Sequence, residues 1–200
     1  WFNLILGVLF VAVMAFGEWK DGLFGAIIVR PYGFDQNQPT AYGHPDTAFD
    51  REYLFILSEM DSRIHQAVEY GDEFEGTEFL GDYFSNYWFI NGRVAPDDMA
   101  EPFVSWLPTQ PYNIVPRMHP GEKLLMRVIN AGRDLHPYHH HGNHALIIAR
   151  DGNMLESAPG QGPDVGYEVF TIQAVPGETY DAIFTWTGAR MGWDIYGTPA

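Results

Sequence analysis

The sequence predicts an all-β fold, either a sandwich or a barrel of short strands, with a short apolar segment near its start. Period-two alternation is the first sign: Leu124, Met126 and Val128 fall on one face of a predicted strand, and residues 180–186 alternate in the same way. Gly- and Pro-containing turns bound the apolar runs, and no long amphipathic helix pattern occurs.

The predicted elements are short and are separated by polar segments. Predicted strands lie at residues 24–29, 53–57, 87–91, 124–128, 145–149, 170–174 and 180–186. Residues 31–52 are rich in Pro, Gly, Asn and Asp and predict a loop. Residues 61–70 predict a short helix, because Ile64, Ala67 and Val68 share one helical face.

Composition excludes several classes of function. The chain has 200 residues and a formal net charge of −15, with 26 acidic and 11 basic residues and no basic patch. Because such a surface repels phosphate backbones, we expect no nucleic-acid partner. The absence of cysteine excludes disulfides and thiolate metal sites within this chain, which leaves histidine, carboxylate and methionine as metal ligands.

Residues 4–16 (LILGVLFVAVMAF) are almost wholly apolar. Their length fits the apolar core of a signal peptide better than a full membrane span, which needs about 20 residues. We therefore expect residues 1–16 to be a signal or membrane-anchor segment, with a buried strand as the alternative. Either of the first two interpretations predicts a periplasmic or extracellular protein, membrane-anchored if the segment is retained.

A histidine cluster is the strongest functional signal in the chain. It comprises His136, His139, His140, His141 and His144. In an extended chain, side chains two positions apart share a face, so His139 and His141 would face one region together while His140 faces away. A helix would gather the cluster differently, but Pro137 and Gly142 disfavour one. The cluster predicts a metal site with imidazole ligands.

All-nitrogen ligation suits copper, zinc, iron or nickel, so the residues alone leave the metal open. His44, His65 and His119 are weaker candidates, because each stands alone in its segment. Glu59 and Asp61 follow a predicted strand, where they could support a metal ligand or bind a cation. We expect instead that both lie at a strand end exposed to solvent.

Several segments together resemble the multicopper oxidases. Residues 21–29 (DGLFGAIIV) resemble the end of that family's first cupredoxin domain, and residues 87–93 (YWFINGR) resemble the start of the second. Residues 126–132 (MRVINAG), 148–152 (IARDG) and 176–181 (PGETYD) are similar to later elements of the second domain. The resemblance implies a cupredoxin-like Greek-key β-sandwich.

Residues 136–142 (HPYHHHG) resemble a copper-binding motif of the same family. The resemblance implies a copper cofactor, with His136 at a mononuclear copper that accepts electrons and His139 and His141 at a trinuclear cluster that reduces O2. The substrate would be a small molecule or a metal ion. The family uses four His-x-His pairs for its cluster, so we expect further domains, a partner chain or another copy to complete this one.

The resemblance also implies a domain organisation. After residues 1–16, residues 17–82 would form part of a first cupredoxin-like domain and its linker, and residues 83–200 a domain that carries the histidine cluster. The alternative function is a non-catalytic copper-binding or accessory subunit of a larger membrane complex. A cupin-like mononuclear metal enzyme ranks last, because no glutamate occurs between His141 and Glu156.

Overall fold

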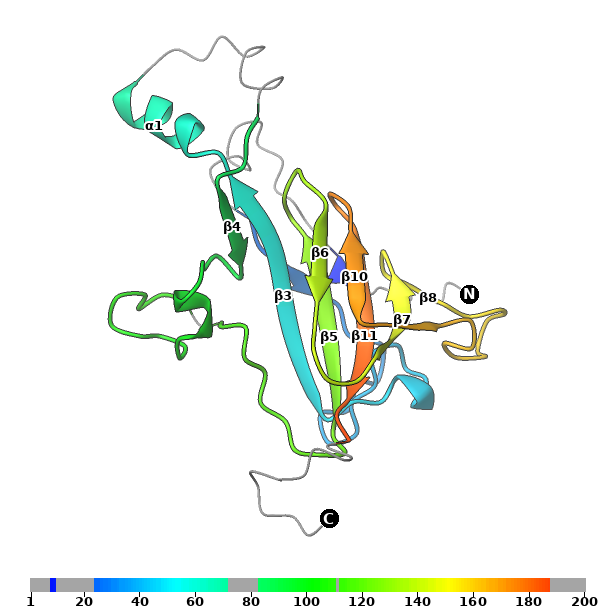
Figure 1. Ribbon diagram of the computed structural model, residues 1–200. Coiled ribbons are helices and arrows are strands. Elements are labelled where there is room, and N and C mark those ends of the chain that lie inside the picture. The colour runs from blue at the N-terminus through cyan, green and yellow to red at the C-terminus, as the bar shows by residue number, and fades with distance from the viewer. Residues whose placement is uncertain (1–7, 10–23, 72–82, 111, 188–200) are drawn as a thin grey trace.

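The computed structural model describes residues 8–9, 24–71, 83–110 and 112–187 (Figure 1). Strands dominate these residues, and one α-helix accompanies them, so the all-β prediction is confirmed. The strands are β1 (Val8–Leu9), β2 (Ile27–Ile28), β3 (Arg51–Met60), β4 (Tyr87–Ile90), β5 (Lys123–Asn130), β6 (His136–His139), β7 (Ala145–Arg150), β8 (Asn153–Met154), β9 (Tyr167–Val169), β10 (Thr171–Ala174) and β11 (Thr179–Thr185). The helix is α1 (Ser62–Tyr70), and two 3₁₀ turns span Pro45–Thr47 and Asp97–Met99.

One large mixed sheet forms the main layer. Its strand order is β4-β3-β5-β11-β7-β8, and β9 also pairs with β7. β3 runs parallel to β5 and antiparallel to β4, so residues before and after position 82 share one sheet. The division into domains between residues 82 and 83 stays a prediction. β3, which precedes that boundary, is a strand of the same sheet as β5.

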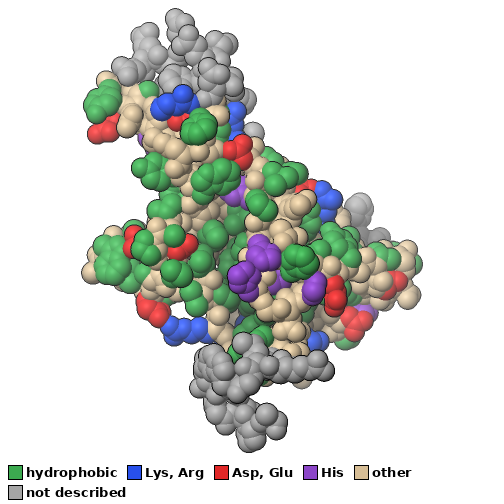
Figure 2. Space-filling model, in the orientation of Figure 1, with side chains coloured by type: hydrophobic (Ala, Val, Ile, Leu, Met, Phe, Trp, Pro, Cys, Tyr) green, Lys and Arg blue, Asp and Glu red, His purple; other side chains and the backbone are tan. Residues whose placement is uncertain are grey.

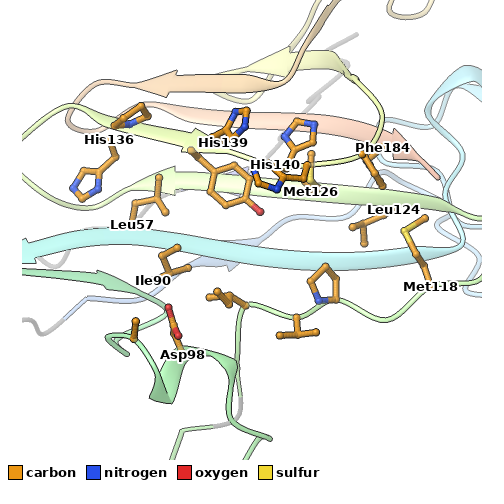
Figure 3. Close-up of a pocket in the computed structure, with 18 of the residues that line it drawn as sticks. Leu57, Ile90, Asp98, Met118, Leu124, Met126, His136, His139, His140 and Phe184 are labelled. Atoms are coloured by element: carbon orange, nitrogen blue, oxygen red, sulfur yellow. The ribbon is translucent and has the colours of Figure 1, made fainter. Parts of the chain in front are cut away.

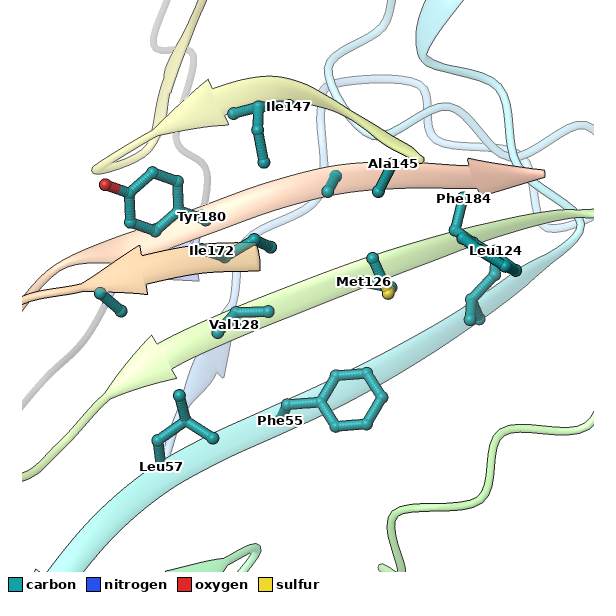
Figure 4. Close-up of a cluster of buried hydrophobic side chains, with 12 residues drawn as sticks. Phe55, Leu57, Leu124, Met126, Val128, Ala145, Ile147, Ile172, Tyr180 and Phe184 are labelled. Atoms are coloured by element: carbon teal, nitrogen blue, oxygen red, sulfur yellow. The ribbon is translucent and has the colours of Figure 1, made fainter. Parts of the chain in front are cut away.

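A smaller sheet of β6 and β10 forms a second layer over the main one, which makes the fold a sandwich. The core between them is built by alternation: Leu124, Met126 and Val128 of β5 point inward, as the sequence predicts. Tyr180, Ala182 and Phe184 of β11 do the same, and Ile172 and Ala174 of β10 close the core from above, as Figure 4 shows for most of this cluster. Burying this apolar surface provides the main driving force for folding.

The opposite face of the main sheet is covered by the polar segment that follows β2. Its side chains Tyr42 and Phe49 pack against Leu125, Ile148 and Ile183, which are the outward members of their strands. The segment is a loop with one 3₁₀ turn, as its composition predicts. Both faces of the sheet are therefore buried, which explains why β5 and β7 read as continuous apolar runs.

The predicted helix is confirmed as α1. Asp61 caps its N-terminus by accepting a hydrogen bond from the backbone of Arg63, and Gly71 ends it in the left-handed conformation. Its one buried residue is Ile64, on the apolar face that the sequence predicts.

Little of the N-terminal apolar segment falls within the described residues. β1 pairs with β2 in an antiparallel ladder of two residues each, and the rest of residues 4–16 lies outside the described part. Among the described residues, no helix has the length and apolar character needed to cross a membrane. The signal or anchor assignment therefore stays a prediction.

Candidate metal centre

The histidine cluster lies on β6 and on the turn that leads from it to β7. β6 pairs with β10 in an antiparallel register that joins His136 to Ala174 and His139 to Thr171. Residues 136–139 therefore form a strand and not a helix, in line with the expectation that Pro137 and Gly142 disfavour a helix. Since side chains alternate along a strand, the register determines which histidines meet.

His139 and His141 are exposed and lie together, His139 at the end of β6 and His141 in the turn that follows. Their ring centroids are 4.9 Å apart, with the rings at 73° to each other. Figure 2 shows histidine side chains gathered at the surface on this side of the molecule. The geometry predicted from period two, a pair at i and i+2 that shares one face, is therefore present.

His140 is on the other face of the chain, also as predicted. Its ring packs edge-on against Phe184 at 5.4 Å and lies 6.4 Å from the ring of Tyr138. Both ring nitrogens are shielded from solvent. Burial lowers the pKa of His140; a hydrogen bond with the backbone of Asn143 opposes that shift, and the neighbouring histidines add to it.

His136 is buried and faces β3 instead of the exposed pair. Its Nε2 lies 2.6 Å from Oε2 of Glu59, whose side chain is only 1% exposed. Burial alone would raise the pKa of Glu59, but hydrogen bonds from His136 and from the backbone of Arg133 outweigh it and hold that pKa below its usual value. Trp88 packs edge-on against the imidazole at 4.9 Å.

The expectation that Glu59 and Asp61 lie at an exposed strand end is wrong. Asp61 is 2% exposed and binds the helix start, and Glu59 supports His136 from β3, a strand 77 residues away in sequence. Gly132 makes room for this contact, because a Cβ placed there would lie 1.8 Å from Oε2 of Glu59. Sequence reasoning missed Gly132 because its constraint comes from a distant strand.

His144 is exposed but separate from the pair. Its ring packs edge-on against Phe170, with the ring centroids 5.2 Å apart. The ring of His139 packs edge-on against the same phenyl ring, at a centroid distance of 5.7 Å. Within the described ranges, no group of three or more His, Asp or Glu side chains gathers to hold a metal. The residues present thus fit copper as two imidazole ligands, and the remaining ligands of such a centre would come from elsewhere.

The weaker histidine candidates lie in separate parts of the fold. His44 caps a 3₁₀ turn through its Nδ1, His65 lies within α1, and His119 starts a turn closed by Glu122. None joins a group of three donors among the described residues.

A cavity of about 900 Å³ lies under the inner face of β6. Residues 136–142, which include His139 and His141, contribute to one wall, and residues between Trp88 and Met118 contribute to the other. Figure 3 shows His136 and His140 on the β6 side and Asp98 on the opposite side. Most of the other lining side chains are apolar, and Asp98, Met118 and Met126 are the further side chains there of a type that can bind a metal.

The described residues form a cupredoxin-like β-sandwich that presents a pair of exposed histidines at the end of one strand. No protein-family model and no curated protein sequence matches the chain. Among solved structures, it is similar to the blue copper oxidase from Nitrosomonas europaea, with a TM-score of 0.52 and 23% identity over 81% of this chain and 39% of that one.

Two further structures show the same likeness. The laccase from Botrytis aclada gives a TM-score of 0.55 and 20% identity over 84% of this chain and 26% of that one. Fet3p, a multicopper oxidase that functions in iron import, gives 0.51 and 14% over 84% of this chain and 25% of its own. The multicopper oxidase resemblance is thus confirmed for the fold, and the chain spans two fifths or less of the length of these structures.

Proposed function

We propose that this chain is a copper-binding module of a multicopper-oxidase-type oxidoreductase. In this proposal, His139 and His141 supply two imidazole ligands, and another domain, a partner chain or a second copy supplies the rest. The complete assembly would oxidise a small molecule or a metal ion and reduce O2. The apolar segment at residues 4–16 supports a periplasmic or extracellular location for this chemistry.

The observation that carries the proposal is the exposed pair of His139 and His141. Two imidazoles at 4.9 Å on one face can approach the same metal region without unfolding the strand. β6 is held by its ladder with β10, so His139 sits on a paired strand of the sandwich, and His141 follows two residues later. Copper, when bound, supplies the one-electron chemistry, and the chain binds and orients it.

The buried histidines have different parts in this proposal. His140 packs inside, with its ring edge-on against Phe184. His136 has its Nε2 engaged by Glu59, so only Nδ1 remains for any metal. Both residues therefore belong to the support of the strand in the conformation described, and the exposed pair carries the binding.

The test is copper titration of the purified chain, with metal content measured after removal of loosely bound ions. We expect His139→Ala and His141→Ala each to lose most Cu(II) binding, whereas the control His65→Ala on α1 keeps it. No intense blue absorption should develop, because the chain has no cysteine. Unchanged copper binding in both variants of the pair would overturn the proposal.

A second function is favoured by the lack of a third donor group among the described residues. A non-catalytic module would bind or deliver copper without turnover and could serve as an accessory subunit of a larger membrane complex. Assaying O2 consumption with the copper-loaded chain, with and without candidate partner domains, separates the two. Copper binding without turnover in every combination would favour the accessory function.

A further inference from the structure

Thr171 and His139 are direct neighbours across the small sheet. The register of β10 and β6 places them opposite each other, next to the pair formed by Ile172 and Tyr138. Directly opposed side chains share a face and have Cβ atoms about 5 Å apart. The threonine hydroxyl therefore lies beside the imidazole on the exposed side of the sheet.

The contact between them is a hydrogen bond through one particular ring nitrogen. Oγ1 of Thr171 lies 2.8 Å from Nδ1 of His139. Phe170 packs edge-on against the same imidazole at 5.7 Å and 88°. The ring is thus held by a polar contact and an aromatic contact, both contributed by the segment that leads into β10.

We propose that Thr171 is the positioning residue for the metal site. Its hydroxyl oxygen accepts a hydrogen bond from Nδ1–H of His139, which leaves Nε2 unprotonated and free to bind the metal. This inference rests on the proposed function of His139 as a ligand. A neutral imidazole has one donor nitrogen and one acceptor nitrogen, so fixing the proton at Nδ1 decides which nitrogen can bind. Metal-binding histidines commonly have the other nitrogen held in this way.

The other cluster members lack this arrangement. His141 is exposed, and no described residue forms a hydrogen bond with its ring. Both nitrogens of His140 are shielded from solvent, and His136 is bonded to a carboxylate through Nε2. His139 alone in the described part of the cluster combines an exposed ring with a fixed Nδ1. We therefore expect His139 to be the pre-oriented ligand and His141 to adjust around it.

The tautomer can be measured without any metal. In the metal-free protein labelled with ¹⁵N-histidine, we expect the His139 signals, assigned by their loss in His139→Ala, to show protonated Nδ1 and unprotonated Nε2. Thr171→Val keeps the shape of the side chain but removes the hydroxyl, so the proton should move towards Nε2. Thr171→Ser should restore the original tautomer, and Thr185→Val on β11 should leave it unchanged.

Copper affinity gives the second readout. We expect Thr171→Val to weaken Cu(II) binding about 10- to 100-fold, as for other residues that orient a ligand, and Thr171→Ser to keep most of the affinity. A His139 ring protonated at Nε2 in the unmodified protein would overturn the inference. So would a Thr171→Val protein with unchanged tautomer and affinity.

The two proposals fail in different ways. If His139→Ala leaves copper binding intact, the proposed ligand is wrong, even where the metal-free spectra show that Thr171 holds Nδ1. If His139→Ala abolishes binding while Thr171→Val changes neither tautomer nor affinity, the ligand stands and the positioning role of Thr171 is wrong.

Discussion

At the scale of single residues, a charged group is buried on the face of the main sheet opposite the histidines. Arg127 on β5 is fully buried and donates to Asp181 on β11 at 2.9 Å and to Glu52 on β3 at 2.6 Å. The hydroxyl of Tyr42, in the covering loop, donates a hydrogen bond to the carboxylate of Asp181. Burial raises the pKa of Asp181, and Arg127 opposes that shift, so the carboxylate depends on its cation to stay ionised.

Removing one partner of this group should cost more than removing both. Arg127→Met leaves Asp181 buried without its cation, and we expect a loss of about 3–5 kcal/mol in the free energy of unfolding. The double variant Arg127→Met with Asp181→Leu should recover much of that loss, because neither charge remains buried. Denaturant unfolding of the single and double variants measures the difference. Equal stability of both variants would show that the charges are not coupled.

At the scale of elements, the junction of β3 and α1 depends on Asp61. The carboxylate accepts hydrogen bonds from the backbone of Phe84 and from the side chain and backbone of Arg63. The Arg63 side chain, against the opposing effect of burial, is the main cause that lowers the pKa of Asp61 from 3.8 to about 2. One carboxylate thus joins the strand, the helix and the segment before β4.

This lowered pKa predicts a specific pH dependence. Because the pKa of Asp61 is lower in the folded than in the unfolded chain, its ionised carboxylate contributes its full stabilisation above the unfolded-state pKa. That stabilisation is lost as the pH falls through the folded-state pKa, here about 2. Relative to Asp61→Asn, which can still cap the helix, the unmodified chain should be about 2 kcal/mol more stable near neutral pH. That advantage should shrink between about pH 4 and pH 2, as measured by urea unfolding at each pH. A difference that stays constant with pH would contradict the assignment.

Elements also mark the limit of what the sequence could predict. Period two correctly placed His139 and His141 together and His140 apart, because alternation is a local property of a strand. The supports of the cluster could not be predicted in the same way. Thr171 reaches His139, and Glu59 reaches His136, only through pairing and packing of strands distant in sequence. Glu59 looked like a solvent-exposed strand end because its burial depends on Gly132 and β6.

At the scale of the whole molecule, the proposed function assigns the described sandwich one side of a metal centre. The pair of His139 and His141 lies at the surface, and no third donor joins it within the described part of the chain. The aligned 81–84% of this chain covers only 25–39% of the length of the structures of similar fold. A centre with several coupled coppers therefore needs ligands beyond those described.

That requirement predicts how copper behaves when this chain binds it alone. Two imidazoles on one exposed face can hold a single Cu(II) ion, but they cannot bridge and support a coupled pair of ions. Every bound Cu(II) should then be an isolated spin, so the doubly integrated EPR signal should equal the copper content measured chemically. The copper should also be removed readily by a chelator, since water fills its remaining positions. Addition of a domain or chain that completes the site should make part of the copper EPR-silent through coupling and should slow its removal. EPR-silent Cu(II) in the isolated chain would instead mean that this chain, or an assembly of its own copies, already builds the coupled site.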